Sequence, residues 1–291
     1  MKLFYSQEYV SAAHAFDTTR KASSIAASLI RDPIAGIDLA KPEPVSGAQL
    51  LEIHEAGYID AVRTGSPAFL AESQGFPWDA GIWEAVRAST GGVIAAARQA
   101  LSDGVAGTLS SGLHHATAGS GAGFCTFNGL ALAARAAHGD TGGRVLILDL
   151  DAHCGGGTHE IVGCLPWVRC LDVAVNPFDA YRPAGDNTLD LVSDPARYLE
   201  TVERRLAECG KDYALCLYNA GMDPFGGGGF GGLRGITREI LARREALVLA
   251  WCRDNGIPAA FTIAGGYTGL GLDLDGLVSL HRLTIAAAAG R

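Results

Sequence analysis

Asp151 and His153 are the residues of this chain whose types and spacing most directly suggest chemistry. They end a hydrophobic run that reads Ile147-Leu-Asp-Leu-Asp-Ala-His153. Side chains two residues apart on an extended segment point the same way, so this carboxylate and imidazole could bind one ion, and the pair suits zinc or iron(II). Asp149 shares that parity and could orient a ligand. Polar residues also end buried strands without any function, so the segment alone leaves both interpretations open.

A strand must present these side chains, and hydrophobic runs of strand length recur along the chain. They lie at 145–150, 213–219 and 258–264, with weaker runs at 104–109 and 169–175. Helical patterns separate several of them, at 84–101, 128–138, 196–208 and 236–254. Nearly continuous apolar strands that alternate with helices predict an α/β fold. We expect a single domain, residues 1–291, with a central, mostly parallel β-sheet and helices on both faces.

Polar residues that follow these strands are the candidates for chemistry, because ligands of open parallel sheets bind beyond the carboxyl ends of the strands. The candidates are His114, His115, Asp149, Asp151, His153, Asp223 and Tyr267. Asp151, His153 and Asp223 are the right number of ligands for a catalytic metal that keeps one position open. The paired histidines could supply a general base and acid, with Asp149 fixing one tautomer. Tyr267, on a Gly-Gly turn, could donate to a developing oxyanion.

The composition limits the partners that we expect. The chain has 291 residues, 48% of them hydrophobic, and a formal net charge of -8. It contains no Lys/Arg run, so nucleic acid and anionic membranes are not expected partners. No segment has the ~20 apolar residues of a membrane span, and we identify no signal peptide. These features predict a soluble, cytoplasmic protein with free thiols at its seven cysteines, and they leave a homo-oligomer open.

Several separated motifs carry a resemblance to a known family. In chain order they are Gly112-Leu-His-His-Ala116, Gly123-Phe-Cys-Thr-Phe-Asn128, Asp149-Leu-Asp-Ala-His153, Asn219-Ala-Gly-Met-Asp223 and Gly265-Gly-Tyr267. In order and spacing they resemble the histone deacetylase and acetylpolyamine amidohydrolase superfamily, and they span about half of the chain. The resemblance implies an arginase-like α/β fold with the active site at the carboxyl ends of the strands.

The resemblance also implies a role for each matching residue. The catalytic centre would consist of the zinc ligands Asp151, His153 and Asp223, the acid–base pair His114 and His115, and the oxyanion donor Tyr267. Substrate contacts would come from Gly123, Phe124 and Gly265, with Phe124 lining the acyl tunnel. A structural potassium ion would take Asp149 and Asp172 as side-chain ligands. The expected cofactors are therefore Zn²⁺, with Fe²⁺ as the alternative metal, and K⁺.

Three departures from the family pattern bear on this assignment. Gly156 stands where the family has an Asp or Asn, which predicts that His115 lacks its partner and that His114 carries more of the acid–base work. The second aromatic wall aligns with Tyr181-Arg182-Pro183 and puts Arg182 near the site, where it would either pair with an anionic acyl group or point to solvent. Gly75 replaces the Asp with which histone-directed members grip a peptide, which disfavours a protein substrate.

Three functions remain in view. The first is a zinc-dependent amidohydrolase that removes an acyl group from a small-molecule or acyl-lysine-like amine. The second is an arginase-like ureohydrolase, which needs two manganese ions and further carboxylates; Gly155 and Gly221 stand where those would be. The third is a binding or scaffold protein that has lost turnover, which the expected absence of a partner for His115 supports.

Overall fold

One parallel sheet runs through the protein. The computed structural model describes residues 1–13 and 17–290. Within those ranges eight strands form the order β2-β1-β3-β8-β7-β4-β5-β6, and every pairing is parallel. The strands are β1 (Lys2–Phe4), β2 (Asp38–Ala40), β3 (Val105–Thr108), β4 (Val145–Asp149), β5 (Val168–Ala174), β6 (Thr188–Leu191), β7 (Leu215–Asn219) and β8 (Ala259–Thr262).

The middle of the sheet forms where the sequence is most continuously apolar. All residues of β4, β7 and β8 are buried, as is typical of parallel strands covered on both faces. Each of the five predicted runs contains a strand, and the predicted parallel sheet is confirmed. The strands β1, β2 and β6 were not predicted, because each is short and includes a charged residue that interrupts the apolar run. That the whole chain forms one domain stays a prediction.

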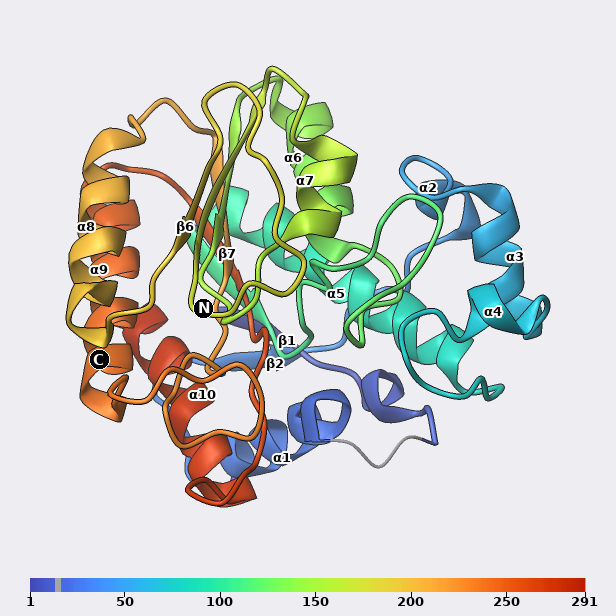
Figure 1. The fold of residues 1–291 in the computed structure, drawn as a ribbon, viewed down its shortest axis with the longest axis horizontal. Coiled ribbons are helices and arrows are strands. Elements are labelled where there is room, and N and C mark those ends of the chain that lie inside the picture. Colours follow the sequence, from blue (N-terminus) through green and yellow to red (C-terminus); the bar gives the residue numbers. More distant parts are fainter. Residues whose placement is uncertain (14–16, 291) are drawn as a thin grey trace.

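Helices cover both faces of the sheet (Figure 1). On one face lie α5 (Ile82–Asp103) and α6 (Gly129–Thr141), and on the other lie α1 (Asp17–Arg31), α8 (Tyr198–Glu208), α9 (Arg238–Asp254) and α10 (Leu274–Ala288). Four of these match the predicted helical segments. Short helices complete the chain: η1 (Gln7–Val10), α2 (Gly47–Leu50), α3 (Ala56–Thr64), α4 (Ala68–Ala71), α7 (Gly156–Val162) and η2 (Pro195–Arg197). Two clusters of buried apolar side chains fill the interior.

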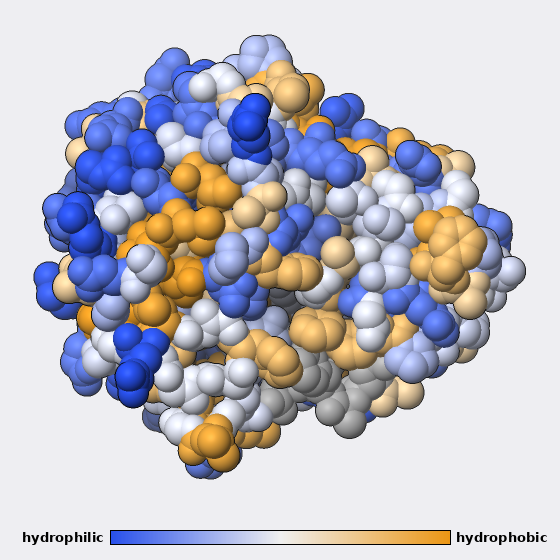
Figure 2. Space-filling view, in the orientation of Figure 1, coloured by the Kyte–Doolittle hydropathy of each residue, from blue (hydrophilic) through white to orange (hydrophobic). Residues whose placement is uncertain are grey.

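The parallel arrangement brings the carboxyl ends of all strands to one edge of the sheet. The loops that follow β3, β4, β5, β7 and β8 therefore meet there, and these loops contain the candidate residues. The space-filling view shows polar side chains over much of the visible surface, with smaller apolar areas between them (Figure 2). In the part of the chain that the structure describes, no helix is both long and apolar enough to cross a membrane.

Candidate active site

Asp151, His153 and Asp223 converge at the ends of β4 and β7. One ligand atom of each lies within 4.8 Å of the others. Nδ1 of His153 is 3.1 Å from Oδ1 of Asp151 and 3.2 Å from Oδ2 of Asp223. The two strands are neighbours in the sheet, with Asp149 opposite Asn219, so their loops start side by side. The predicted ligands thus come together, as a shared metal would require.

The charges of this cluster fit a divalent cation. Burial disfavours the charged imidazole of His153, but hydrogen bonds to Asp151 and Asp223 outweigh it and raise its pKa to about 10. Burial and the neighbouring Asp151 raise the pKa of Asp223 to about 6. Within the described residues, no donor other than the His153 imidazole, 3.2 Å away, approaches Oδ2 of Asp223. Two buried carboxylates need a compensating positive charge, and their oxygens with one imidazole nitrogen are a donor set that zinc accepts.

Glycines let the ligand loops pack against each other. Gly265 donates its N–H to Oδ2 of Asp151 over 2.6 Å, and a Cβ at 265 would overlap the carboxylate of Asp223. A Cβ at Gly221 would lie 2.6 Å from Cα of Asp151, and one at Gly155 would lie 2.7 Å from Oδ2 of Asp149. The site therefore has no room for the extra carboxylates that a two-manganese centre would need at 155 and 221.

Arg244 of α9 binds the backbone of the two segments that carry the predicted ligands Asp151 and Asp223. Its side chain is fully buried and donates to the carbonyl oxygens of Leu150 at 3.0 Å and Gly221 at 2.6 Å. It also donates to Oε1 of Glu245 at 2.7 Å and to the hydroxyl of Tyr198 at 3.0 Å. Leu150 precedes Asp151 and Gly221 lies two residues before Asp223, so one guanidinium fixes the backbone beside two ligands.

His114 lies between two carboxylates. Its Nδ1 is 2.7 Å from Oδ2 of Asp149 and its Nε2 is 3.6 Å from Oδ1 of Asp151. Asn219 donates to the other oxygen of Asp149 over 2.8 Å, which fixes that carboxylate. Burial opposes a charge on His114, but the attraction of Asp149 and Asp151 prevails and raises its pKa to about 10. The geometry thus favours a positively charged His114.

His115 has a carboxylate partner, so the prediction that it lacks one is wrong. Its Nδ1 is 2.8 Å from Oδ2 of Asp179, in the loop after β5. The same oxygen accepts the N–H of Gly157 over 3.1 Å. The sequence prediction failed because it looked for the partner only at position 156, within the metal motif. Burial and the charge on His114 lower the pKa of His115 to about 4, against the opposing effect of Asp179.

Aromatic rings surround the two histidines. The ring of Phe124 stacks on Phe76 at 5.0 Å between centroids and lies 6.3 Å from Tyr267. Phe178 meets His115 edge-on at 4.9 Å and His153 at 6.0 Å. A Cβ at Gly123 would lie 3.0 Å from the Phe178 ring, so this glycine permits the close approach. Phe124 therefore lines the cavity, and Phe178 packs beside His115 and His153.

The aromatic residue of this loop that contacts His115 and His153 is Phe178, and within the described residues neither Tyr181 nor Arg182 makes a ring contact with either histidine. Tyr181 instead stacks on His159 at 4.2 Å. Arg182 is exposed and does not line the cavity. Gly75 does lie close to Phe124, since a Cβ at this position would be 3.9 Å from the ring, as expected for the loop at the mouth of the tunnel.

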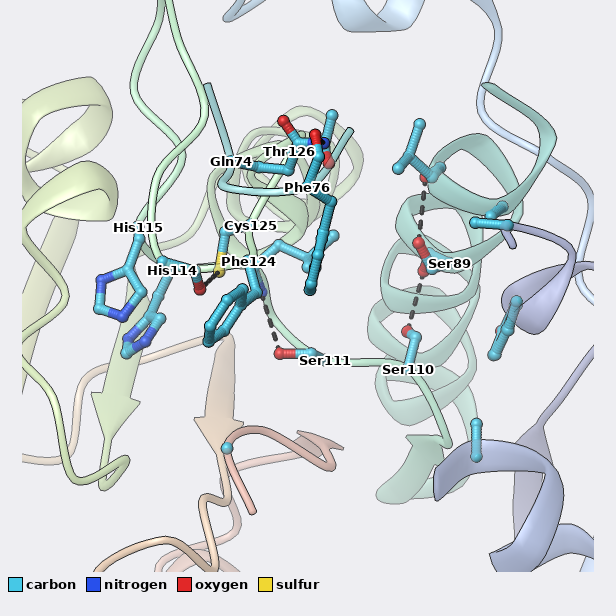
Figure 3. A pocket seen from close by; sticks show the side chains of 18 of the residues that line it. Gln74, Phe76, Ser89, Ser110, Ser111, His114, His115, Phe124, Cys125 and Thr126 are labelled. Carbon is cyan, nitrogen blue, oxygen red and sulfur yellow. Dashed lines mark hydrogen bonds between the residues drawn. The ribbon is translucent and has the colours of Figure 1, made fainter. Parts of the chain in front are cut away.

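A cavity of about 110 Å³ connects these groups. Its lining includes His114, His115, Phe124, Asp151 and Tyr267. Figure 3 shows both imidazoles at one end beside the Phe124 ring, Ser89 and Ser110 at the other end toward α5, and Ser111 between them. The predicted acid–base pair, tunnel residue and oxyanion donor thus line one cavity.

Comparison with known proteins agrees with this arrangement. The family model for the histone deacetylase domain matches residues 14–274. The chain belongs to the histone deacetylase family. It is a deacetylase-like hydrolase acting on amide bonds, and the resemblance predicted from its motifs is confirmed.

Relatives of this deacetylase-family chain differ in length. It is 35% identical to an uncharacterized protein of Picosynechococcus sp., over 85% of this chain and 84% of the relative. It is 28% identical to histone deacetylase 2 of Arabidopsis thaliana, over 79% of this chain and 63% of that protein. It is 35% identical to the acetoin utilization protein AcuC of Bacillus subtilis, over 42% of this chain and 34% of AcuC. The chain thus spans less than two thirds of these last two relatives.

Solved structures share the fold. The acetylpolyamine aminohydrolase from Burkholderia pseudomallei superposes with a TM-score of 0.81 at 19% identity, over 99% of this chain and 98% of that one. The HDA15 HD domain also gives 0.81 at 19% identity, over 100% of this chain and 89% of that one. At this identity, the likeness identifies the deacetylase fold.

The predicted potassium ligands of this deacetylase-family chain lie on neighbouring strands. Asp149 of β4 is in register with Asp172 of β5. Gly155 donates to Oδ2 of Asp172 over 2.7 Å, whereas Oδ1 has no hydrogen-bond partner among the residues described. Burial and the charge of Asp149 raise the pKa of Asp172 well above its usual range. His114 compensates the charge of Asp149, so the remaining negative charge on Asp172 favours a proton or a cation beside it.

Proposed function

We propose that this chain is a zinc-dependent amidohydrolase that removes an acyl group from the amine of a small molecule or an acyl-lysine-like compound in the cytoplasm. One observation carries the proposal: the donor atoms of Asp151, His153 and Asp223 meet beside two histidines, each hydrogen-bonded to a carboxylate. The partner of His115 removes the main argument for a scaffold without turnover.

The metal would be held by Asp151, His153 and Asp223. When bound, zinc would supply a Lewis acid that polarises the amide carbonyl and lowers the pKa of a water molecule. Asp149 and Asp172 would hold a structural K⁺, whose charge would offset their buried carboxylates.

The two histidines take different parts in this proposal. Because Nδ1 of His115 bonds to Asp179, its Nε2 keeps a lone pair that can accept a proton from the attacking water. His115 then returns this proton to the nitrogen of the leaving amine, giving a carboxylate and a free amine. His114, with carboxylates at both nitrogens, keeps its charge and stabilises the negative charge that develops beside it.

Tyr267 and the aromatic walls complete the site. The Tyr267 ring is 7% exposed and lines the same cavity as the histidines, so its hydroxyl can donate to the developing oxyanion. Phe124 and Phe178 would enclose the acyl chain and exclude water. An acetylated amine is the substrate class that we propose for this cavity, and the structural neighbour from Burkholderia pseudomallei is an acetylpolyamine aminohydrolase.

Hydrolysis by the zinc-loaded protein tests the proposal. A panel of acetylated lysine and polyamine compounds should release amine with zinc and not after chelation. Tyr267→Phe should lower kcat by roughly 10²–10³-fold with unchanged zinc content. Tyr5→Phe, which removes only an exposed hydroxyl bonded to Gln7, is the matched control. One zinc per chain without hydrolysis of any acylated amine would contradict the proposal, as would an unchanged rate in Tyr267→Phe.

A further inference from the structure

A turn in the loop after β5 contacts His115 through two consecutive residues. Phe178 packs its ring edge-on against the imidazole at 4.9 Å, and the next residue, Asp179, accepts from Nδ1 at 2.8 Å. The turn is itself fixed, because the carbonyl of Phe178 accepts the N–H of Cys154 over 3.0 Å and its own N–H bonds to Asn176 at 2.9 Å. Asp179 has φ +60°, a conformation that Asp, Asn and Gly adopt more readily than other residues.

Gly156 faces this turn, and its lack of a side chain allows the turn to approach His115. A Cβ at position 156 would overlap both the carboxylate and the backbone carbonyl of Asp179. Any side chain at 156 would therefore push the turn away from His115. A side chain at 156 and the carboxylate of Asp179 would compete for the same space.

We propose that Asp179 is the positioning residue of His115, and that Gly156 and Asp179 form an exchangeable pair in which the glycine admits the distant carboxylate. This inference rests on the proposed function, because it assigns to Asp179 the orientation of the proposed base. The hydrogen bond from Nδ1 keeps the proton on that nitrogen and leaves the lone pair on Nε2. It also prevents rotation of the ring.

A cycle of three variants tests the exchange. Asp179→Gly keeps a residue suited to φ +60° and removes the carboxylate, so kcat should fall about 10–100-fold with KM and zinc content nearly unchanged. Gly156→Asp alone should also lower kcat, because it collides with the turn. The double variant Gly156→Asp/Asp179→Gly restores one carboxylate and removes the collision with the Asp179 side chain. Only the backbone carbonyl at 179 must still shift, so kcat should recover part of the loss and exceed that of either single variant. Asp179→Asn should be intermediate.

Rescue distinguishes positioning from a general structural effect, since a damaged turn would not be repaired by a carboxylate from another loop. The matched control is Asp186→Asn, in the same loop but paired with Arg144 at the surface, which should leave kcat unchanged. An unchanged kcat in Asp179→Gly would overturn the inference. So would a folded, zinc-loaded double variant that stays as slow as the single variants.

A spectroscopic readout separates this inference from the proposed function. In zinc-loaded protein with ¹⁵N-labelled histidine, long-range ¹H–¹⁵N spectra should show His115 protonated at Nδ1 only, with the signal assigned by its loss in His115→Ala. Asp179→Gly should lose this tautomer and the double variant should regain it. If wild-type His115 lacks this tautomer, the inference is wrong. If the tautomers change as expected but no acylated amine is hydrolysed, the proposed function fails while the positioning role stands.

Discussion

Replacement of Arg244 by Met is the most demanding test of how this site is held together. Met has a similar length and stays apolar, but it provides none of the guanidinium hydrogen bonds. The variant would leave the carbonyl groups of Leu150 and Gly221 without their donor and Glu245 without its positive partner. Arg244 and Glu245 are 0% and 1% exposed, so water does not replace what is lost.

The expected loss of stability follows from these contacts. Each stranded carbonyl costs about 1–3 kcal/mol, and breaking a buried ion pair on one side costs about 3–5 kcal/mol in total. For domains somewhat smaller than this one, 1 kcal/mol shifts Tm by about 2–4 °C, so Arg244→Met should lower Tm by roughly 10 °C. The zinc affinity should fall too, since the released carbonyls belong to the segments that carry Asp151 and Asp223.

Urea and thermal unfolding of the zinc-loaded protein, followed by circular dichroism, would measure this. Arg243→Met is the matched control on the same helix, because Arg243 is exposed, and it should change stability by less than about 0.5 kcal/mol. In Arg244→Met/Glu245→Gln the uncompensated charge is gone, so part of the loss should be recovered. A loss below about 1 kcal/mol in Arg244→Met would refute the view that this guanidinium holds the ligand loops.

Two further predictions concern the metal. The pKa of about 10 for His153 means that the metal-free protein carries a proton on this imidazole at pH 7.5, and zinc must displace this proton on binding. Calorimetry in buffers of different ionisation enthalpy should therefore detect about one proton released per zinc bound. Binding heats that do not depend on the buffer would exclude this charge state. In Gly265→Ala the new methyl group would overlap the carboxylate of Asp223, so zinc affinity should fall at least 10-fold by metal competition. Gly139→Ala on α6, where a Cβ meets nothing within 4 Å, is the control, and wild-type affinity in Gly265→Ala would show that the loops adjust freely.

The parts of the site that local sequence patterns could predict are those that lie on one strand end. The apolar run before Asp149 determines both β4 and the direction of the alternating side chains, so Asp151 and His153 could be paired from spacing alone. The parallel order then brings Asp223 beside them. These relations follow from the period of a strand and from the alternation of strands and helices.

The partner of His115 could not be found in this way. Asp179 lies in an irregular loop whose path depends on packing against α7 and on the hydrogen bond to Gly157, and neither leaves a periodic signal. Gly156 read in isolation indicates a lost carboxylate. Considered together with an acidic residue in the facing loop, Gly156 indicates that the carboxylate has moved to that loop. For Arg182 the sequence left two alternatives open, and its exposed position agrees with the one in which it points to solvent.

Phe178 and Asp179 are consecutive residues, and this adjacency restricts how the protein can be altered. One side chain borders the proposed acyl tunnel and the other orients the proposed base, so a substitution that widens the tunnel also disturbs proton transfer. Acceptance of bulkier acyl chains should therefore come at the expense of turnover in this chain. In a relative that carries this carboxylate at position 156, the width of the tunnel and the orientation of the base could change independently. The loop that supplies the carboxylate therefore affects how acyl-chain specificity can evolve.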